Sequence, residues 1–385
     1  RQFRNNAKIS AMGIPQISAI MGSCVAGGAY LPIMSDEALI VEKTGSVFLA
    51  GSHLVKAAIG ENIENEKLGG ADTHCDISGI ADYKCKNDQE AIQIIRELIG
   101  KIEDKQKIGF SRTESKKPKK NINDIYGIFP KQRETSYEMK EILERIVDDS
   151  FLREYKENYG KTLICAYARI DGWAVGIVAN QRKMVKTGKG EMQLGGVIYS
   201  DSSDKAARFI MNCNQKGVPL LFVQDVNGFM VGSRAEENGI IKDGAKMLNA
   251  MANSIVPKFT LIIGNSYGAG NYAMCGKAYD PRLILAWPTA KIAVMGADQA
   301  SKVILDLEES KLKKDGKILE KSEKENLLQS IQQTYNNQMT PYYAASRMWI
   351  DEIISPIDTR KYISMGIEAS NNNTKGEFKT GVIQT

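Results

Sequence analysis

The chain has 385 residues, which is long enough for two ordinary domains of about 100 to 200 residues each. Hydrophobic residues make up 43% and charged residues 25%, as in globular proteins, and no apolar run reaches the roughly 18 residues of a membrane span. The net charge of +5 gathers in lysine-rich stretches at 115–120 and 311–321 without interleaved aromatics, so we expect neither a membrane nor a nucleic-acid partner.

The six cysteines are scattered without a CxxC pair, and there are only two histidines, so no metal site is expected. Unpaired cysteines predict a reducing compartment, which would be the cytoplasm, or the mitochondrial matrix if the source is eukaryotic. The chain starts at Arg1 and runs through Ile9–Gly13 directly into an apolar segment. We therefore expect the first domain to be N-terminally truncated.

The first predicted strand is Ile14–Met21, because this short run is rich in β-branched residues and is followed by Gly22. A helix is expected to begin near Gly27. The order of strand, turn and helix recurs at Gly217–Asp225 and at Val256–Gly264. Alternating elements of this kind predict an α/β fold.

A polar stretch rich in lysine, proline and asparagine begins at Ser111 and separates two predicted domains. The second domain opens with helical periodicity over Tyr137–Asp149 and with two strands over Lys161–Asn180, which turn at Asp171-Gly172. The resulting division is a first domain at 1–118, a linker at 119–135 and a second domain at 136–385.

An internal repeat is the most informative feature of the sequence. GIPQISAIMGSCVAGGAY, which starts at Gly13, aligns without a gap with IVPKFTLIIGNSYGAGNY, which starts at Ile255. Identical pairs include Pro15 and Pro257, Gly22 and Gly264, Gly28 and Gly270, and Tyr30 and Tyr272. Two strands around a turn are expected after each copy, at 40–49 and 283–295, so the chain is predicted to contain one fold twice.

Each glycine turn follows a predicted strand and opens a predicted helix, where unpaired backbone N–H groups attract an oxyanion. The small residues of Ala26–Gly28 and Gly268–Gly270 would let a substrate carbonyl approach these groups. The alternative is that the glycines only turn the chain. Because GxxxxGK[ST] and the Rossmann pattern are both absent, nucleotide binding is set aside.

Side-chain catalysis by a histidine base or a serine triad fits the sequence poorly. Neither histidine lies near a glycine turn, and no serine stands in a GxSxG setting. A reaction that runs on backbone donors, with its base supplied by a cofactor, fits better.

The chain resembles the carboxyltransferase (β) subunits of biotin-dependent acyl-CoA carboxylases over nearly all its length, most of all the methylcrotonoyl-CoA carboxylase type. The motifs that carry this resemblance are MGSCVAGGAYLPIMSDE, VFLAGSHLVKAAIGE, LGGADTHCDISGIAD, NGFMVG, IIGNSYGAGNYAMCGKAYDPR and WIDEIISPIDTR. The resemblance implies two tandem crotonase-like domains, of which the first binds the acyl-CoA and the second binds carboxybiotin.

The resemblance also implies a homo-oligomer, commonly a hexamer, in which the first domain of one subunit faces the second domain of another. No biotin-accepting Met-Lys-Met context and no ATP-handling module occur in the sequence. Biotin is therefore expected on a partner α subunit that holds the biotin carboxylase and the biotin carrier, with none bound covalently to this chain.

In the reaction that the resemblance implies, carboxybiotin releases CO₂, the freed ureido nitrogen takes a proton from the acyl group, and the enolate attacks CO₂. The catalytic residues form two oxyanion holes: Ala26 and Gly27 for the enolate, and Ala269 and Gly270 for the ureido oxygen. The internal repeat gives Gly268 and Ala269 as the equivalent pair, so Gly268 joins the binding residues.

Other predicted substrate- or biotin-binding residues flank the two holes. Gly28 and Tyr30 follow the first, Asn271 and Tyr272 follow the second, and Asn227, Gly228 and Phe229 lie where a strand should end. The alternatives are that the tyrosines pack in a core and that Asn227-Gly228 is an ordinary turn.

The expected substrate is 3-methylcrotonoyl-CoA, an intermediate of leucine catabolism. The sequence SSDKAARF, within 193–210, looks more like the propionyl-CoA members, so a β subunit for propionyl-CoA or another acyl-CoA is one alternative. The others are the carboxyltransferase of a biotin-dependent decarboxylase, such as the glutaconyl-CoA type, and a non-catalytic assembly module.

Overall fold

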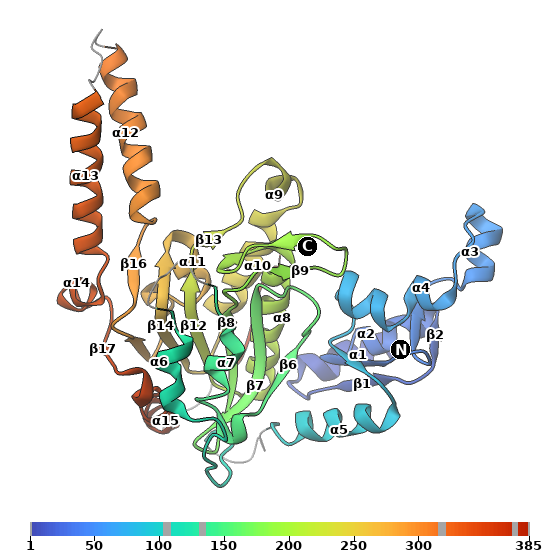
Figure 1. The fold of residues 1–385 in the computed structure, drawn as a ribbon. Helices are drawn as coiled ribbons and strands as arrows, with labels where there is room; N and C mark the ends of the chain where they lie inside the picture. The colour runs from blue at the N-terminus through green and yellow to red at the C-terminus, as the bar shows by residue number, and fades with distance from the viewer. Residues whose placement is uncertain (1, 103–108, 131–135, 315–320, 372–375, 384–385) are drawn as a thin grey trace.

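Figure 1 shows the chain as a computed structural model that describes residues 2–102, 109–130, 136–314, 321–371 and 376–383. The end of the predicted linker, 131–135, lies outside the described residues. The order of helices and strands confirms a mixed α/β fold. In the described ranges, no helix combines the length and the apolar character that a bilayer crossing requires.

The first region, residues 2–102, is built on two small parallel sheets. One has the order β1-β3-β5, and the other pairs β2 with β4. Its strands are β1 (Ile17–Ile20), β2 (Ser23–Val25), β3 (Glu37–Val41), β4 (Ser46–Phe48) and β5 (Tyr83–Cys85). Its helices are α1 (Gln2–Ala11), α2 (Gly27–Ile33), α3 (Ser52–Ile59), α4 (Asn65–Gly69), α5 (Asp88–Ile99) and the π-helical turn η1 (Thr73–Ile77).

The second region is built on an eight-stranded mixed sheet with the order β17-β15-β14-β12-β8-β7-β6, in which β16 lies beside the end of β14. Its strands are β6 (Leu152–Tyr155), β7 (Leu163–Ile170), β8 (Trp173–Asn180), β12 (Leu220–Val226), β14 (Lys258–Tyr267), β15 (Leu283–Ala286), β16 (Lys291–Ala293) and β17 (Glu352–Ile353). The strands predicted at 161–180, 217–225 and 256–264 are confirmed.

Helices cover both faces of this sheet. On one face lie α8 (Ser200–Lys216) and α10 (Ile240–Ala252), and on the other lies α15 (Thr359–Ser370). Each face of the sheet packs against its helices in a separate hydrophobic core. Successive side chains of β12 alternate between these cores, with Phe222 on the side of α8 and α10 and Val223 on the side of α15. A strand buried on both faces is mostly apolar, which is why the first four residues of β12, LLFV, show no alternation of polar and apolar residues.

The remaining elements are short or project from the body. α12 (Ala297–Lys314) and α13 (Lys321–Gln338) extend side by side away from the sheet (Figure 1). The short elements are η2 (Ile122–Asp124), α6 (Ile125–Ile128), α7 (Met139–Leu143), η3 (Asp148–Ser150), β9 (Val185–Lys186), β10 (Met192–Gln193), β11 (Val197–Ile198), β13 (Gly228–Phe229), α9 (Ser233–Glu237), α11 (Gly268–Ala273), η4 (Lys277–Tyr279), α14 (Pro341–Ser346) and η5 (Pro356–Asp358).

The helix predicted over Tyr137–Asp149 is wrong in length, because only α7 is α-helical there. The chain leaves the helix so that the carboxylate of Asp148 can accept the N–H groups of Asp171 and Gly172, each at 2.8 Å. These bonds hold the turn between β7 and β8. A tertiary contact has therefore overridden the local helical pattern.

The two regions share one core. Leu39 and Tyr83 of the first region belong to the same buried cluster as Phe209 and Met247 of the second. In this junction Glu37 forms a buried ion pair with Lys216, and its carboxylate also accepts the hydroxyl of Tyr83 at 3.1 Å and that of Tyr167 at 3.2 Å. The division at 119–135 stays a prediction, since buried contacts join the parts on either side of it.

The internal repeat reappears in the strand pairing. β1 pairs with β3 and then β2 pairs with β4, just as the first part of β14 pairs with β15 and its last part with β16. Ile17 and Phe259, the aligned residues, each open the first pairing, and Ser23 and Asn265 each open the second. The gapless sequence alignment thus matches equivalent positions in space, while the crotonase-like type of the two domains stays a prediction.

Candidate functional site

The first glycine turn lies at the start of α2. The N–H of Ala26 donates to the carbonyl of Phe48 at 3.1 Å, so it is already engaged. α2 begins at Gly27, and the N–H groups of Gly27 and Gly28 therefore have no acceptor within the helix. Both glycines are exposed, and a Cβ added at Gly28 would meet no atom within 4 Å. Two backbone donors without a helical acceptor thus belong to exposed residues of this turn.

The second glycine turn lies at the start of α11. Gly268 has a φ of 48°, and the aligned Ala26 has a φ of 53°, so both copies turn through the left-handed region at the same position. α11 begins at Gly268, which leaves the N–H groups of Gly268 and Ala269 without an acceptor inside the helix. Ala269 is exposed. The second turn therefore also presents backbone donors at an accessible surface.

Gly270 has a packing role as well as its predicted catalytic one. It is buried, and a Cβ at this position would lie 2.7 Å from Cγ2 of Val226 and 3.1 Å from Cα of Gly228. Only a residue without a side chain lets α11 approach the end of β12 so closely. A glycine is therefore required at position 270 by packing alone, whatever its part in a site.

The predicted segment at 227–229 lies beside the second turn. The N–H of Asn227 donates to the carbonyl of Gly196 at 2.7 Å, and its side-chain oxygen accepts the amide of Asn265 at 2.9 Å. β13 carries Gly228 and Phe229 and pairs with β11, and the ring of Phe229 is partly buried against the core and lies close to Gly244. Asn227 and Gly228 thus border the turn, whereas Phe229 supports it.

The remaining predicted residues differ in exposure. Asn271 lies behind the second turn, where its amide donates to the hydroxyl of Ser266 at 2.8 Å, so its contacts are structural. Tyr272 is exposed and meets Tyr279 edge to face. Tyr30 is also exposed and meets Phe3 in the same way. Neither Tyr30 nor Tyr272 is a core tyrosine, and both remain available to line a ligand site.

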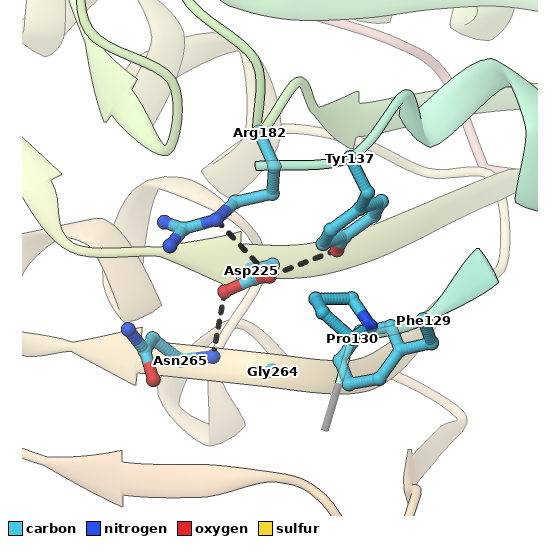
Figure 2. Close-up of a pocket in the computed structure, with 7 residues that line it drawn as sticks. All are labelled: Phe129, Pro130, Tyr137, Arg182, Asp225, Gly264 and Asn265. Carbon is cyan, nitrogen blue, oxygen red and sulfur yellow. Dashed lines mark hydrogen bonds and ion pairs between the residues drawn. The ribbon is translucent and has the colours of Figure 1, made fainter. Parts of the chain in front are cut away.

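An acidic residue that the sequence reading missed supports the second turn (Figure 2). Asp225 lies near the end of β12, and its Oδ1 accepts the N–H of Asn265 at 2.8 Å while its Oδ2 accepts the hydroxyl of Tyr137, also at 2.8 Å. Nε of Arg182 lies 3.3 Å from Oδ2. Phe129, Pro130 and Gly264 complete the lining of a cavity of about 10 Å³, the size of one water.

The cysteine next to the second turn is not a reactive group. Cys275 lies just after α11, but it is buried, and this burial raises the pKa of its thiol to about 12, so it is a thiol and not a nucleophile at neutral pH. His74 is held by Ser78 and by the carbonyl of Val47, so both of its ring nitrogens are engaged. Among the described residues, no group of His, Cys, Asp and Glu side chains is arranged to hold a metal ion.

The two turns do not face each other within one chain. α2 packs on α1 and on β1, β2 and β3, while α11 packs on α10, β12, β13 and β14. Figure 1 shows α2 and α11 on different parts of the molecule. A site that used both turns would have to combine the first turn of one copy with the second turn of another.

Comparison with known proteins identifies the family. The model of the carboxyl transferase domain matches residues 1–382. A probable methylcrotonoyl-CoA carboxylase beta chain from Drosophila melanogaster is 42% identical over 100% of this chain and 67% of its own length. The biotin-dependent 3-methylcrotonyl-coenzyme A carboxylase beta1 subunit of Mycobacterium tuberculosis is 43% identical over 95% of this chain and 67% of its own.

The methylcrotonoyl-CoA carboxylase beta chain of Dictyostelium discoideum is 43% identical over 97% of this chain but only 61% of its own length. The chain thus spans about two thirds of the length of the curated relatives it matches.

Solved structures agree with the sequence comparison. The transcarboxylase 12S structure with hydrolysed methylmalonyl-coenzyme A bound, whose title describes a hexamer assembly, superposes with a TM-score of 0.85 at 31% identity, covering 100% of this chain and 71% of that one. The beta subunit of geranyl-CoA carboxylase from P. aeruginosa has a TM-score of 0.60 at 35% identity, with 100% and 69% covered. The chain belongs to the carboxyl transferase domain family, among the beta subunits of biotin-dependent acyl-CoA carboxylases.

Proposed function

We propose that the protein is the carboxyltransferase subunit of a methylcrotonoyl-CoA type carboxylase and that its two glycine turns are oxyanion holes with different ligands. The observation that supports this most is the pair of turns in matching register, each with backbone donors at an exposed surface. One chain carries both turns on separate parts of its surface. An oligomer in which two copies face each other, as a hexamer allows, would bring them together.

The first turn would hold the thioester of the acyl-CoA. When the α or γ carbon of the acyl group loses a proton, negative charge develops on the thioester oxygen, and two N–H groups at hydrogen-bond distance stabilise it. The predicted donors were Ala26 and Gly27. Because the N–H of Ala26 donates to Phe48, we propose Gly27 and Gly28 as the donors of this hole.

The second turn would hold the ureido group of biotin, with Gly268, Ala269 and Gly270 around its oxygen. When bound, biotin supplies CO₂ and a nitrogen that takes the proton from the acyl group. The residues fit such a group, because the donors of Gly268 and Ala269 have no acceptor within α11, and the exposed ring of Tyr272 follows them. Each donor lost from a hole of this kind costs roughly 2.7 to 4 kcal/mol of transition-state stabilisation.

Biotin would reach this site on a partner subunit that carries the biotin carboxylase and the biotin carrier. For the acyl group we propose 3-methylcrotonoyl-CoA, since relatives named for that substrate are 42% and 43% identical to this chain, against 35% for an acetyl-/propionyl-coenzyme A carboxylase beta5 subunit. The compartment would be the cytoplasm of a bacterium or the mitochondrial matrix of a eukaryote.

The test is carboxylation by the protein assembled with its biotin-carrying partner. We expect avidin-sensitive incorporation of labelled bicarbonate into 3-methylcrotonoyl-CoA, with lower kcat/KM for propionyl-CoA and no decarboxylation of glutaconyl-CoA. Gly27→Val and Gly270→Val should each abolish incorporation. Normal activity in the double variant would contradict the proposal of two oxyanion holes. Oligomerisation without any binding of coenzyme A esters would favour a non-catalytic assembly module.

A further inference from the structure

We infer that Asp225, anchored by Arg182 and Tyr137, is a positioning residue that fixes the second glycine turn. Its catalytic consequence rests on the proposed function of that turn, whereas its structural role does not. Asp225 is 4% exposed and lies near the end of the central strand β12, in line with the place where β14 enters the turn.

The carboxylate of Asp225 fills an irregularity between β12 and β14. Gln224 pairs with Ile262, but Val226 pairs with Ser266, so three residues of β14 face the single residue Asp225. At this point Asp225 Oδ1 accepts the N–H of Asn265 at 2.8 Å. The side chain thus replaces the backbone acceptor that a regular ladder would provide.

The irregularity determines where β14 goes next. Before it, residues 259–262 pair with β15, and after it, Asn265 to Tyr267 pair with β16. The turn begins directly after this second pairing, at Gly268. A bond at Asn265 therefore sets the position of the strand end from which the N–H groups of Gly268 and Ala269 are presented.

Gly264 allows the carboxylate to reach this position. A Cβ at Gly264 would clash with the carboxylate of Asp225, so the glycine and the acid are required together. Asn265 links Asp225 to two further residues. Its side-chain amide donates to Asn227 at 2.9 Å, and its side-chain oxygen accepts the hydroxyl of Tyr267 at 3.1 Å. The segment beside the turn and the strand that enters it are thus fixed to one group.

Two contacts hold the carboxylate of Asp225, and a third holds its backbone. Its second oxygen accepts the hydroxyl of Tyr137 at 2.8 Å and lies 3.3 Å from Nε of Arg182, and the backbone N–H of Asp225 donates to the side chain of Asn180 at 3.2 Å. Arg182 packs against Gly196, whose carbonyl accepts the N–H of Asn227. These partners fix the orientation of the buried carboxylate.

We call the carboxylate of Asp225, held by Arg182 and Tyr137, the clamp of the second turn. The first turn has no such clamp among the described residues. Gly22 is aligned with Gly264, but a Cβ at Gly22 would meet no atom within 4 Å. β1 pairs with β3 on one side only, so no strand lies where β12 lies beside β14. The clamp therefore belongs to the second turn alone and is not a general requirement of the repeated fold.

The experiment compares Asp225→Ala and Asp225→Asn with the matched control Asp148→Ala in the protein assembled with its biotin-carrying partner. Asp148 is also a buried carboxylate that accepts turn N–H groups and pairs with an arginine, Arg360, at 2.5 Å, but the turn it holds joins β7 and β8. The readouts are kcat and KM for carboxylation and hydrogen exchange at the amide of Asn265.

We expect Asp225→Ala to lower kcat about 100-fold, the effect of a misplacement near 1 Å, with little change in the KM for acyl-CoA. Asp225→Asn keeps one oxygen for Asn265 and should lose less. Exchange at Asn265 should be fastest in Asp225→Ala, intermediate in Asp225→Asn and unchanged in Asp148→Ala. Asp148→Ala should lower the Tm but leave kcat of the folded enzyme near that of the unmodified protein.

Unchanged exchange at Asn265 in Asp225→Ala would overturn the clamp, and so would a kcat equal to that of Asp148→Ala. If the unmodified assembly showed no carboxyltransferase activity, the proposed function would fail, while the exchange experiment would still decide the structural role of Asp225. If Asp225→Ala does not fold, Asp225→Asn and Tyr137→Phe supply the same comparison, and normal kcat and exchange in both would also overturn the clamp.

Discussion

The two glycine turns align residue by residue, yet they are supported very differently. β14 enters the second turn as one strand of ten residues between β12 and β15, and the carboxylate of Asp225 holds it in place. The first turn follows two short strands, and the first of them, β1, is paired on one side only. A repeated sequence motif therefore conserves the local backbone path without conserving what holds that path in place.

The same contrast appears in backbone strain. Gly268 occupies the left-handed region without cost, whereas Ala26 occupies it with φ 53° and ψ −125°, where an alanine Cβ is crowded. The first turn is thus strained and open, and the second is relaxed and packed. We expect substitutions in the two turns, and at the junction that joins their regions, to have effects of different size and sign.

The largest effect should come from the junction. Lys216→Met would leave Glu37 buried and unpaired, since both side chains are almost completely buried. We expect the free energy of unfolding to fall by about 3–5 kcal/mol, as for other broken buried pairs. Urea unfolding measures this. The double variant Glu37→Gln with Lys216→Met should recover most of the loss, and equal losses in the single and double variants would contradict the argument.

A second junction group should make stability depend on pH. Burial lowers the pKa of Lys101, which follows α5, from 10.5 to about 8. Between pH 8 and 10.5 the unfolded chain holds a proton that the folded chain has released, so the free energy of unfolding should rise with pH, by at most roughly 3 kcal/mol. Lys101→Met should remove this rise, and a slope unchanged by that substitution would assign it to other groups.

An added methyl group should be tolerated less well at Gly264, in β14, than at the aligned Gly22. In Gly264→Ala the new Cβ would clash with the carboxylate of Asp225, and we expect a destabilisation of about 1–3 kcal/mol, typical of overpacking. Gly22→Ala, the aligned substitution, meets no atom within 4 Å and should leave the Tm nearly unchanged. Equal effects would show that the two turns are supported alike.

The smallest effects should differ in sign. Ala26→Gly removes a side chain from the left-handed region and should stabilise the protein by about 1–2 kcal/mol, less the entropy that glycine loses on folding. Gly268→Ala introduces the same strain and places a Cβ 2.7 Å from the carbonyl oxygen of Val294, so it should destabilise the protein. Thermal unfolding of both variants tests this, and effects of the same sign would contradict it.

Local signals in the sequence predicted much of the fold. The apolar runs at 217–225 and 256–264 are strands, and Asp171-Gly172 turns a hairpin, because these patterns depend on neighbours in the chain. The helix over 137–149 was predicted too long, because the contact of Asp148 with the hairpin turn comes from tertiary structure. The core shared by the two regions was not predicted, since no local pattern tells which strand faces which helix.

The candidate site was predicted only where it depends on backbone conformation. Glycine is informative at Gly268 and Gly270, because a positive φ disfavours other residues at the first position and a close approach leaves no room for a side chain at the second. Asp225 and Arg182 were missed, since their contact joins β12 to the segment that follows β8. The available signal was weak: an ionisable residue next to the last position of a largely apolar strand, where a charge requires a partner.

The unpaired side of β1 has a further consequence for handling the protein. Within the described part of the chain, the four residues of β1 pair with a strand on one side only, so the other side offers its backbone groups to an extended segment. At high concentration, a neighbouring molecule would supply the extended segment that pairs there. Concentration-dependent association through this edge would compete with ordered assembly.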